Sequence, residues 1–346
     1  MMTSLSTPAR VVEAWHQLGL RVGHASDPVG ATGCTVLLGT NTAFRCASAL
    51  LGRASATREL ETCAPTHLVD RTDAILLTGG SAYGLDAAAG VMRWLEERGR
   101  GFPVGGGVVP IVPAASLFDL APLGQFAARP DAALARAACT RALDDLPPDE
   151  GSVGAGTGAL VGKARGVAHA MKGGVGMARA DGAPGFAVAL AAVNAFGDVR
   201  DAEGRIIAGA RDDHGGFADA ERLLREGGGV SRFAATRGHT TLVIVAVSAA
   251  MPKAHLAELA HAATAALHRR ITPVGTAWDG DVIFAVSPLD LPDASAPALT
   301  VVQRQAFEML AVHAVADAIE RAVRTARGRD GIPGLADATF PHASYG

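Results

Sequence analysis

His239 and Thr240 stand where a polar, glycine-bearing stretch meets an apolar run, 241–247. A peptide cut between these two residues would give Thr240 a free α-amino group beside its own hydroxyl. An α-amino group titrates near pH ~7.7 to 8.0, so its unprotonated form can accept the proton of the hydroxyl. Thr240 would then supply both nucleophile and base, which is the chemistry of an N-terminal-nucleophile hydrolase.

The same hydroxyl can act before any cut exists. Attack of its oxygen on the His239 carbonyl would form an ester that water then opens. The segment between Asn194 and Thr240 is rich in Arg, Asp and Gly, which favours a mobile surface loop where a backbone cut is tolerated. Cleavage would leave a larger fragment, 1–239, and a smaller one, 240–346, held together by a strand at 241–247. The ordinary alternative is an uncut strand that begins with Thr because β-branched residues suit strands.

The elements that must position these residues are strands and long helices. Apolar runs of strand length, typical of a sheet covered on both faces, span 74–78, 186–193, 241–247 and 282–286. Apolar residues at helical spacing predict one helix through Leu85, Ala88, Met92 and Leu95 with a cap near Gly99, a second through Leu256, Leu259, Ala263 and Leu267, and a third through Phe307, Leu310, Ala314, Ala318 and Val323. Such alternation predicts layers of helix around sheet. No linker divides the chain, so residues 1–346 are expected to form a single domain.

Several motifs in a fixed order carry a more specific signal. They are 72–97 with Gly79-Gly80-Ser81, then Gly154–Gly158, Met171–Gly176, Gly238–Ser248 and Trp278–Asp281. From about residue 20 to 325 the chain resembles the self-processing family that holds L-aminopeptidase/D-esterases, β-aminopeptidases and 6-aminohexanoate-oligomer hydrolases. The resemblance implies a four-layer α/β/β/α sandwich and hydrolysis of amide bonds in small peptides or linear oligomers such as those of 6-aminohexanoate. The alternative is an aminopeptidase that releases N-terminal L- or β-amino acids, with D-esterase or amidase activity.

The resemblance also implies roles for four further residues. Lys172 matches a lysine near the nucleophile, where its charge would lower the pKa of the amine and steady negative charge. Asn194 matches the amide that donates to the oxyanion. Asp279 and Asp281 match two polar positions near the nucleophile and would orient the Thr240 ammonium and hydroxyl. Taken singly, these would be a solvated lysine, a turn asparagine and an Asp-Gly-Asp turn.

The chain departs from the family pattern in three places. Aminopeptidase members tend to carry Ser and Glu where this chain has Asp279 and Asp281, so the pair looks more like the 6-aminohexanoate-oligomer hydrolases. His239 replaces the Asn or Gly found before the nucleophile, which leaves the efficiency of self-cleavage open. A family tyrosine thought to approach the substrate has no match in 125–138, and Tyr83 lies in another motif.

Two alternatives belong to other functional classes. Gly79–Gly84 joins a strand to a helix, as a phosphate-binding loop does. It lacks the Lys-Ser/Thr ending and the GxGxxG spacing, and Asp86 would repel phosphate. The other alternative is an uncleaved, non-catalytic binding protein of the same fold. Retention of Lys172, Asn194, Thr240, Asp279 and Asp281 together argues against it.

Composition narrows partners and location. The net charge of -3 is spread along the chain, without a basic patch for nucleic acid or a membrane surface. The N-terminus lacks the pattern of a signal peptide, and no apolar stretch reaches membrane-spanning length. Cys34, Cys46, Cys63 and Cys139 are too widely spaced to signal a zinc site or a disulfide framework. The sequence thus predicts a cytoplasmic protein with reduced thiols, no metal or cofactor, and a homo-oligomer of cleaved pairs by family resemblance.

Overall fold

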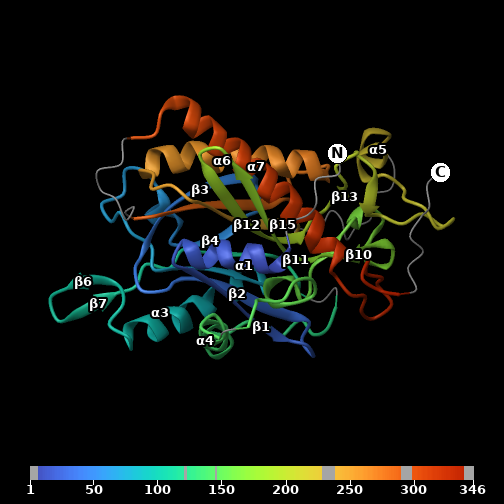
Figure 1. The fold of residues 1–346 in the computed structure, drawn as a ribbon. Helices are drawn as coiled ribbons and strands as arrows, with labels where there is room; N and C mark the ends of the chain where they lie inside the picture. Colours follow the sequence, from blue (N-terminus) through green and yellow to red (C-terminus); the bar gives the residue numbers. More distant parts are fainter. Residues whose placement is uncertain (1–6, 121–122, 145, 228–237, 290–297, 339–346) are drawn as a thin grey trace.

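Two five-stranded sheets stacked face to face form the centre of the computed structural model, which describes residues 7–120, 123–144, 146–227, 238–289 and 298–338 (Figure 1). The first sheet has the order β1 (Leu20–Asp27), β2 (Thr32–Gly39), β5 (Ala74–Thr78), β8 (Ala114–Ser116), β4 (Ala56–Arg58). The second sheet has the order β11 (Gly174–Gly182), β12 (Gly185–Asn194), β15 (Thr240–Val247), β17 (Gly280–Pro288), β3 (Phe44–Gly52).

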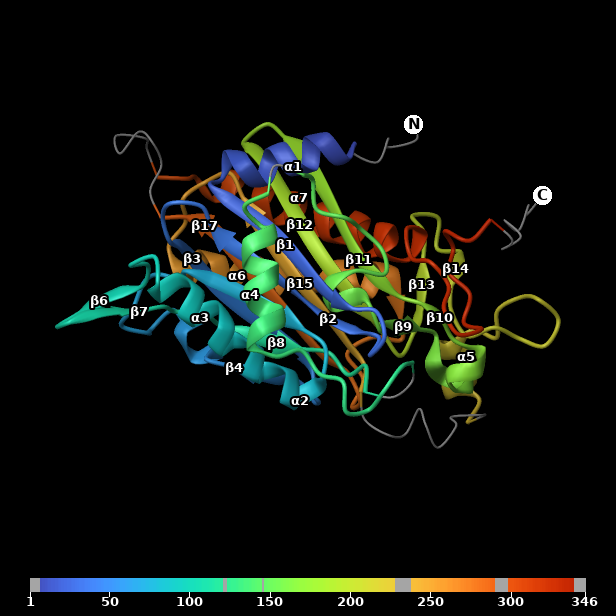
Figure 2. The same cartoon turned by 90° about the horizontal axis from the view of Figure 1, so that it is seen from below.

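Helices cover the outer face of each sheet. Helices α3 (Ala88–Glu96) and α4 (Ala132–Arg141) pack on the first sheet, as Figure 2 shows from below. Helices α6 (Lys253–Arg270) and α7 (Val301–Arg324) pack on the second sheet, and α7 begins with a capping box in which Thr300 and Gln303 bond reciprocally. The buried face of α1 (Pro8–Gln17) joins the core between the sheets.

Strand β15 shows why this layering forms. Its side chains alternate between two cores because successive residues of a strand point to opposite faces. Leu242, Ile244 and Ala246 lie in the core between the sheets, whereas Val243 and Val245 lie in the core under α6 and α7. A strand buried on both faces is expected to be apolar, as this one is from Leu242 to Val247. The predicted α/β/β/α sandwich is therefore confirmed.

Smaller elements surround the sandwich. They are α2 (Ser81–Gly84), the hairpin of β6 (Phe102–Val104) and β7 (Gly107–Val109), the pair β9 (Leu160–Val161) and β10 (Met171–Lys172), the sheet of β14 (Ile206–Ala208), β13 (Asp198–Arg200) and β16 (Ile271–Thr272), helix α5 (Ala220–Arg225), and five 3₁₀ turns at Leu60–Cys63, Leu85–Ala87, Gly154–Gly156, Lys163–Arg165 and Val167–His169. The hairpin projects from the body of the molecule (Figure 1).

The predicted elements agree with the observed ones, with two corrections. All four predicted strands and the three helices are present, although Leu85 lies in a 3₁₀ turn before α3. Gly99 takes the left-handed conformation predicted for a cap, with φ +64. The prediction of one polar loop from 195 to 239 is wrong for 198–225, which holds β13, β14 and α5. Residues 228–237, including part of the Gly227–Gly229 run, lie outside the described residues.

Polar links explain why this segment is ordered. The buried Asp198 carboxylate accepts hydrogen bonds from the N–H groups of Ala210 and Ala220, both at 2.7 Å. One carboxylate thereby ties β13 to the strand-to-helix connection and to the start of α5. A buried charge that is paired in this way holds short elements that have little apolar pattern of their own.

All four cysteines are buried free thiols, and the Sγ atoms of Cys46 and Cys63 lie 3.7 Å apart. Over the described ranges, the helices are each too short or too polar to cross a membrane.

Candidate active site

Three strands of the second sheet bring the predicted junction together. Thr240 is the first residue of β15 and lies directly opposite Asn194, the last residue of β12. Strand β17 runs parallel to β15 and begins at Gly280, and just before it Asp279 forms a bridge with His239. Thr240 and His239 are both buried. The proposed cut therefore lies at the start of the central strand of the sheet, between β12 and β17.

The carbonyl oxygen of His239 accepts two hydrogen bonds. The Thr240 hydroxyl donates to it at 2.7 Å, and the Gly280 N–H donates at 2.9 Å. A backbone N–H aimed at this oxygen would stabilise the negative charge that develops there if the carbonyl were attacked. The role of the Gly280 N–H could not be predicted from the sequence, because a backbone donor leaves no mark in a side-chain pattern.

The side-chain amide of Asn194 is oriented by its neighbours. Its Oδ1 accepts from the Leu160 N–H and from the Lys163 ammonium, each at 3.0 Å. Its Nδ2 therefore faces the other way and donates to the carbonyls of Phe118 at 2.9 Å and Gly238 at 3.4 Å. Asn194 thus faces the residue before His239 and does not bond to the His239 carbonyl itself.

The lysine beside this amide is Lys163. Its buried ammonium donates to the Asn194 carbonyl at 2.9 Å and to the Gly238 carbonyl at 3.4 Å. Burial lowers the pKa of Lys163 to about 7, and Asp279 and Asp119 oppose that shift. Lys163 was not among the predicted site residues, because its only signal in the sequence is that of a single lysine in the otherwise uncharged run 152–164.

Lys172, which was predicted to lie near the nucleophile, bonds to the backbone segment just before Leu160. Its ammonium donates to the carbonyls of Thr157 and Ala159, at 2.9 and 2.8 Å. Burial lowers its pKa to about 7, and nearby Asp119 opposes the shift. Ala159 directly precedes Leu160, whose N–H donates to Asn194 Oδ1. Lys172 therefore supports the segment that orients Asn194.

The Asp281 carboxylate bonds to the backbone just after the junction, whereas the Asp279 carboxylate bonds within the turn before β17. Asp281 accepts from the Thr241 N–H at 2.6 Å, and Asp279 accepts from the N–H and hydroxyl of Thr276 at 2.9 and 2.7 Å. Burial raises the pKa of both carboxyls, and repulsion from Asp279 raises that of Asp281 further. Because strand side chains alternate, Asp281 and Thr241 share one face and Thr240 points to the other. In the uncut chain the Thr240 hydroxyl bonds to His239, not to these carboxylates.

In the glycine-rich segment that was considered as an alternative phosphate loop, the backbone N–H groups of residues 79–81 already donate to protein acceptors. The Gly80 N–H donates to Asp119 at 2.7 Å, and the Gly79 and Ser81 N–H groups donate to backbone carbonyls. A carboxylate at the start of the short α2 leaves no donor set for a phosphate there and would repel it.

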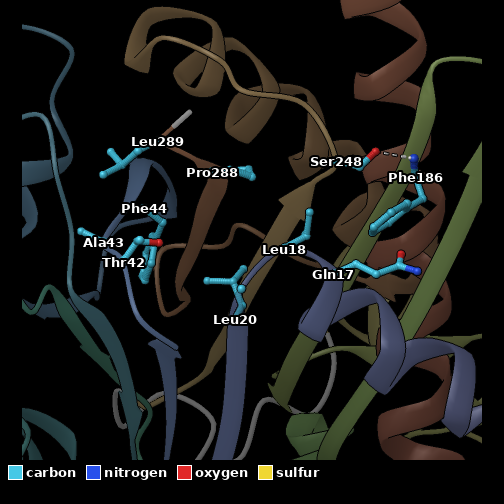
Figure 3. A pocket seen from close by; sticks show the side chains of 11 residues that line it. Gln17, Leu18, Leu20, Thr42, Ala43, Phe44, Phe186, Ser248, Pro288 and Leu289 are labelled. Carbon is cyan, nitrogen blue, oxygen red and sulfur yellow. Dashed lines mark hydrogen bonds between the residues drawn. The ribbon is translucent and has the colours of Figure 1, made fainter. Parts of the chain in front are cut away.

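A cavity of about 420 Å³ lies at the opposite end of β15 and β17 from Thr240. Figure 3 shows its lining, in which Phe44, Phe186 and Leu20 are prominent. Ser248, which also lines it, is eight residues beyond Thr240, a span of about 26 Å along a strand. The cavity is separate from the site described above.

Comparison with known proteins identifies the family. Residues 18–334 match peptidase family S58. An uncharacterised aminopeptidase of Mycobacterium tuberculosis (strain ATCC 25618 / H37Rv) is 39% identical over 327 residues, which cover 88% of this chain and 90% of that protein. A 6-aminohexanoate-oligomer endohydrolase of Kocuria sp. (strain KY2) is 29% identical over 294 residues, which cover 79% and 75%.

Solved structures agree on the fold. A β-aminopeptidase of Burkholderia sp. superposes with a TM-score of 0.64 at 20% identity, covering 92% of this chain and 88% of that one. The L-aminopeptidase D-Ala-esterase/amidase of Ochrobactrum anthropi, a variant of the Ntn hydrolase fold, gives 0.66 at 18% identity, covering 92% and 89%. The chain belongs to peptidase family S58 and is an amide-bond hydrolase, and its fold is that of the Ntn hydrolases.

Proposed function

We propose that Thr240 is the nucleophile and that the chain activates itself by cutting the His239–Thr240 bond. The single domain would then consist of two fragments, 1–239 and 240–346. The proposal is supported above all by one observation: the His239 carbonyl oxygen accepts hydrogen bonds from two donors. The Thr240 hydroxyl and the Gly280 N–H both reach the His239 oxygen.

The self-cleavage step begins when Thr240 Oγ attacks the His239 carbonyl carbon. The C–N bond breaks, the hydroxyl proton passes to the departing Thr240 nitrogen, and an ester joins His239 to Oγ. Water then adds to the ester. This releases the His239 carboxylate and restores the hydroxyl, now beside a free amine. The Gly280 N–H stabilises the oxyanion during both attacks.

Turnover uses the same oxygen on an external amide. The Thr240 amine takes the hydroxyl proton as Oγ attacks the substrate carbonyl, and it returns that proton to the departing amine. The resulting ester is hydrolysed by water. Once Gly238 moves away, Asn194 Nδ2 and the Lys163 ammonium lose an acceptor and are available to the substrate oxygen. Lys172 supports the segment that orients Asn194, while Asp279 and Asp281 position the backbone and the new amine.

Small peptides or linear amide oligomers, such as those of 6-aminohexanoate, are the proposed substrates. The aspartate pair Asp279 and Asp281 and the similarity to an oligomer endohydrolase support this choice. A second candidate is an aminopeptidase that releases N-terminal L- or β-amino acids, which the 39% identity to a protein named as an aminopeptidase favours. The enzyme is proposed to work in the cytoplasm as a homo-oligomer of cleaved pairs, without cofactor, metal, nucleic acid or membrane.

A panel of amides tests the proposal. Wild-type protein, Thr240→Ala and Thr240→Ser are assayed on aminoacyl anilides, β-alanyl amides and a 6-aminohexanoate oligomer. Wild type and Thr240→Ser should hydrolyse at least one class, because both keep a hydroxyl at the nucleophile position. Thr240→Ala should hydrolyse none. Equal activity of Thr240→Ala and wild type would remove Thr240 from the mechanism.

A further inference from the structure

The side chain of His239 lies in an enclosed aromatic environment. The residue is 1% exposed, and its ring stands edge-on to Phe196, with ring centroids 5.1 Å apart and planes at 64°. Phe196 in turn packs on Trp278, with centroids 5.2 Å apart. Both belong to a small apolar cluster, which also holds Ala164, Ala210, Ala218, Ala220, Leu223 and Leu224. A flat ring is therefore accommodated beside Thr240 by an aromatic wall.

The backbone before the cut is equally confined. A Cβ on Gly238 would lie 2.4 Å from the ring of Phe118, and the residue has φ +148. The Gly238 carbonyl also meets the Asn194 amide and the Lys163 ammonium. Residues 238 and 239 thus occupy a defined position against the same groups that the proposed reaction uses on substrate.

Self-cleavage and turnover form the same kind of ester on the same oxygen. In the first ester the acyl residue is His239, and in the second it is the acyl residue of the substrate. Cutting the peptide bond removes the covalent link that keeps the imidazole ring at Thr240. Withdrawal of this ring would open its space to the side chain of an incoming acyl residue.

We infer that Phe196 and Trp278 form the acyl subsite, and that the mature enzyme prefers amides whose acyl residue carries a flat ring of about imidazole size. This inference rests on the proposed function, because it takes Thr240 as the nucleophile. Within the small peptides proposed as substrates, it favours histidyl or phenylalanyl amides over alanyl amides. Aromatic walls favour ring substrates through edge and stacking contacts, and one pocket contact typically changes selectivity by about 10-fold or more.

The test measures kcat/KM of the cleaved enzyme on histidyl, phenylalanyl and alanyl anilides with one common leaving group. The ring-bearing substrates should be hydrolysed about 10-fold faster than the alanyl one. Trp278→Ala should bring this ratio close to 1, mainly through a higher KM for the ring-bearing substrates. Trp278→Phe should keep most of the preference, since a ring remains. A purely structural role for Trp278 would instead lower all three rates by the same factor.

The outcomes separate this inference from the proposed function. If wild type hydrolyses the alanyl anilide best and Trp278→Ala leaves the ratio unchanged, the subsite is wrong and the Thr240 mechanism stands. If wild type and Thr240→Ala are equally active or equally inert on every amide, both proposals fail. Should Trp278→Ala not fold, self-cleavage of His239→Phe and His239→Ala decides. The subsite predicts faster cleavage with the ring, and equal rates would overturn it.

Discussion

At the scale of single residues, Asn194 illustrates how neighbours assign a chemical role. An amide side chain can turn either its oxygen or its nitrogen toward a site. Here the oxygen already accepts hydrogen bonds from the Leu160 N–H and the Lys163 ammonium. Only the nitrogen end is then left to face Gly238. A donor that is fixed in this way needs no reorganisation when negative charge develops beside it.

Replacing this donor tests its role in turnover. If Asn194 is the proposed oxyanion donor, Asn194→Ala removes one hydrogen bond to the developing oxyanion, and such losses typically lower kcat by about 100- to 1000-fold. The measurement is kcat of protein that has already been cleaved, so that processing and turnover are not confused. Asn194→Ala enzyme with wild-type kcat would exclude the oxyanion role.

The buried lysines make a prediction about stability and pH. Lys163 has a pKa of about 7 in the folded chain, against an ordinary value of 10.5. Between these values the unfolded chain holds a proton that the folded chain has released, so the free energy of unfolding rises with pH. One such group contributes at most about 1.4 kcal/mol per pH unit. Lys163→Met, made in the uncleaved Thr240→Ala protein, should flatten the rise between pH 7 and 9.

Urea denaturation at several pH values measures that slope. The matched control is Asp198→Asn, whose effect on stability has the opposite sign and falls at lower pH. Burial raises the pKa of Asp198 to about 6, so its contribution to stability falls as pH rises from 3.8 to 6. Asp198→Asn should leave the slope above pH 7 unchanged. A Lys163→Met protein with an unaltered slope above pH 7 would mean that Lys163 stays charged when folded.

At the scale of elements, the junction depends on how the chain enters β15. Gly238 fits against Phe118 only because it has no Cβ. Gly238→Ala should therefore displace His239 from the Gly280 N–H and slow self-cleavage at least 10-fold, as misplacement of reacting groups generally does. The measurement is the rate at which the full-length band disappears on a denaturing gel.

Two further variants separate this contact from a general effect of the substitution. Gly105→Ala adds a methyl group in open space and should cleave at the wild-type rate. Gly238→Ala combined with Phe118→Ala removes the clash and should recover part of the rate. Normal cleavage by Gly238→Ala alone would show that the entry into β15 is not confined.

Some elements of the fold could be predicted from the sequence, and others could not. Strands β5, β12, β15 and β17 were predictable because strands buried on both faces must be apolar without interruption. Placing Thr240 opposite Asn194 follows once β12 and β15 pair. Lys163 was not predictable, because a 3₁₀ turn after the left-handed Gly162 carries it to the site. The same holds for β13 and α5, which are held by the buried Asp198 carboxylate and not by a periodic pattern.

At the scale of the whole molecule, the proposed cut falls inside one continuous sheet. The smaller fragment would contribute β15 and β17, and these lie between β12 and β3 of the larger fragment. The fragments could separate only by breaking three ladders, β12 with β15, β3 with β17 and β13 with β16, and by exposing the core under α6 and α7.

Cleaved protein should therefore elute as one species under native conditions and as two only after denaturation. Size-exclusion chromatography with light scattering, followed by a denaturing gel of the peak, checks this expectation. Thr240→Ala provides the uncut control of the same composition. Separate native peaks for the two fragments would contradict the shared sheet.

The most direct test of the account is the mass and N-terminal sequence of the fragments of purified wild-type protein. The account predicts a smaller fragment that begins Thr-Thr-Leu-Val, at Thr240, and a larger one that ends at His239. Thr240→Ala should give only the full-length mass, because the attacking oxygen is missing. A smaller fragment with any other first residue, or a Thr240→Ala protein cut at the same bond, would contradict the assignment of Thr240 as the nucleophile.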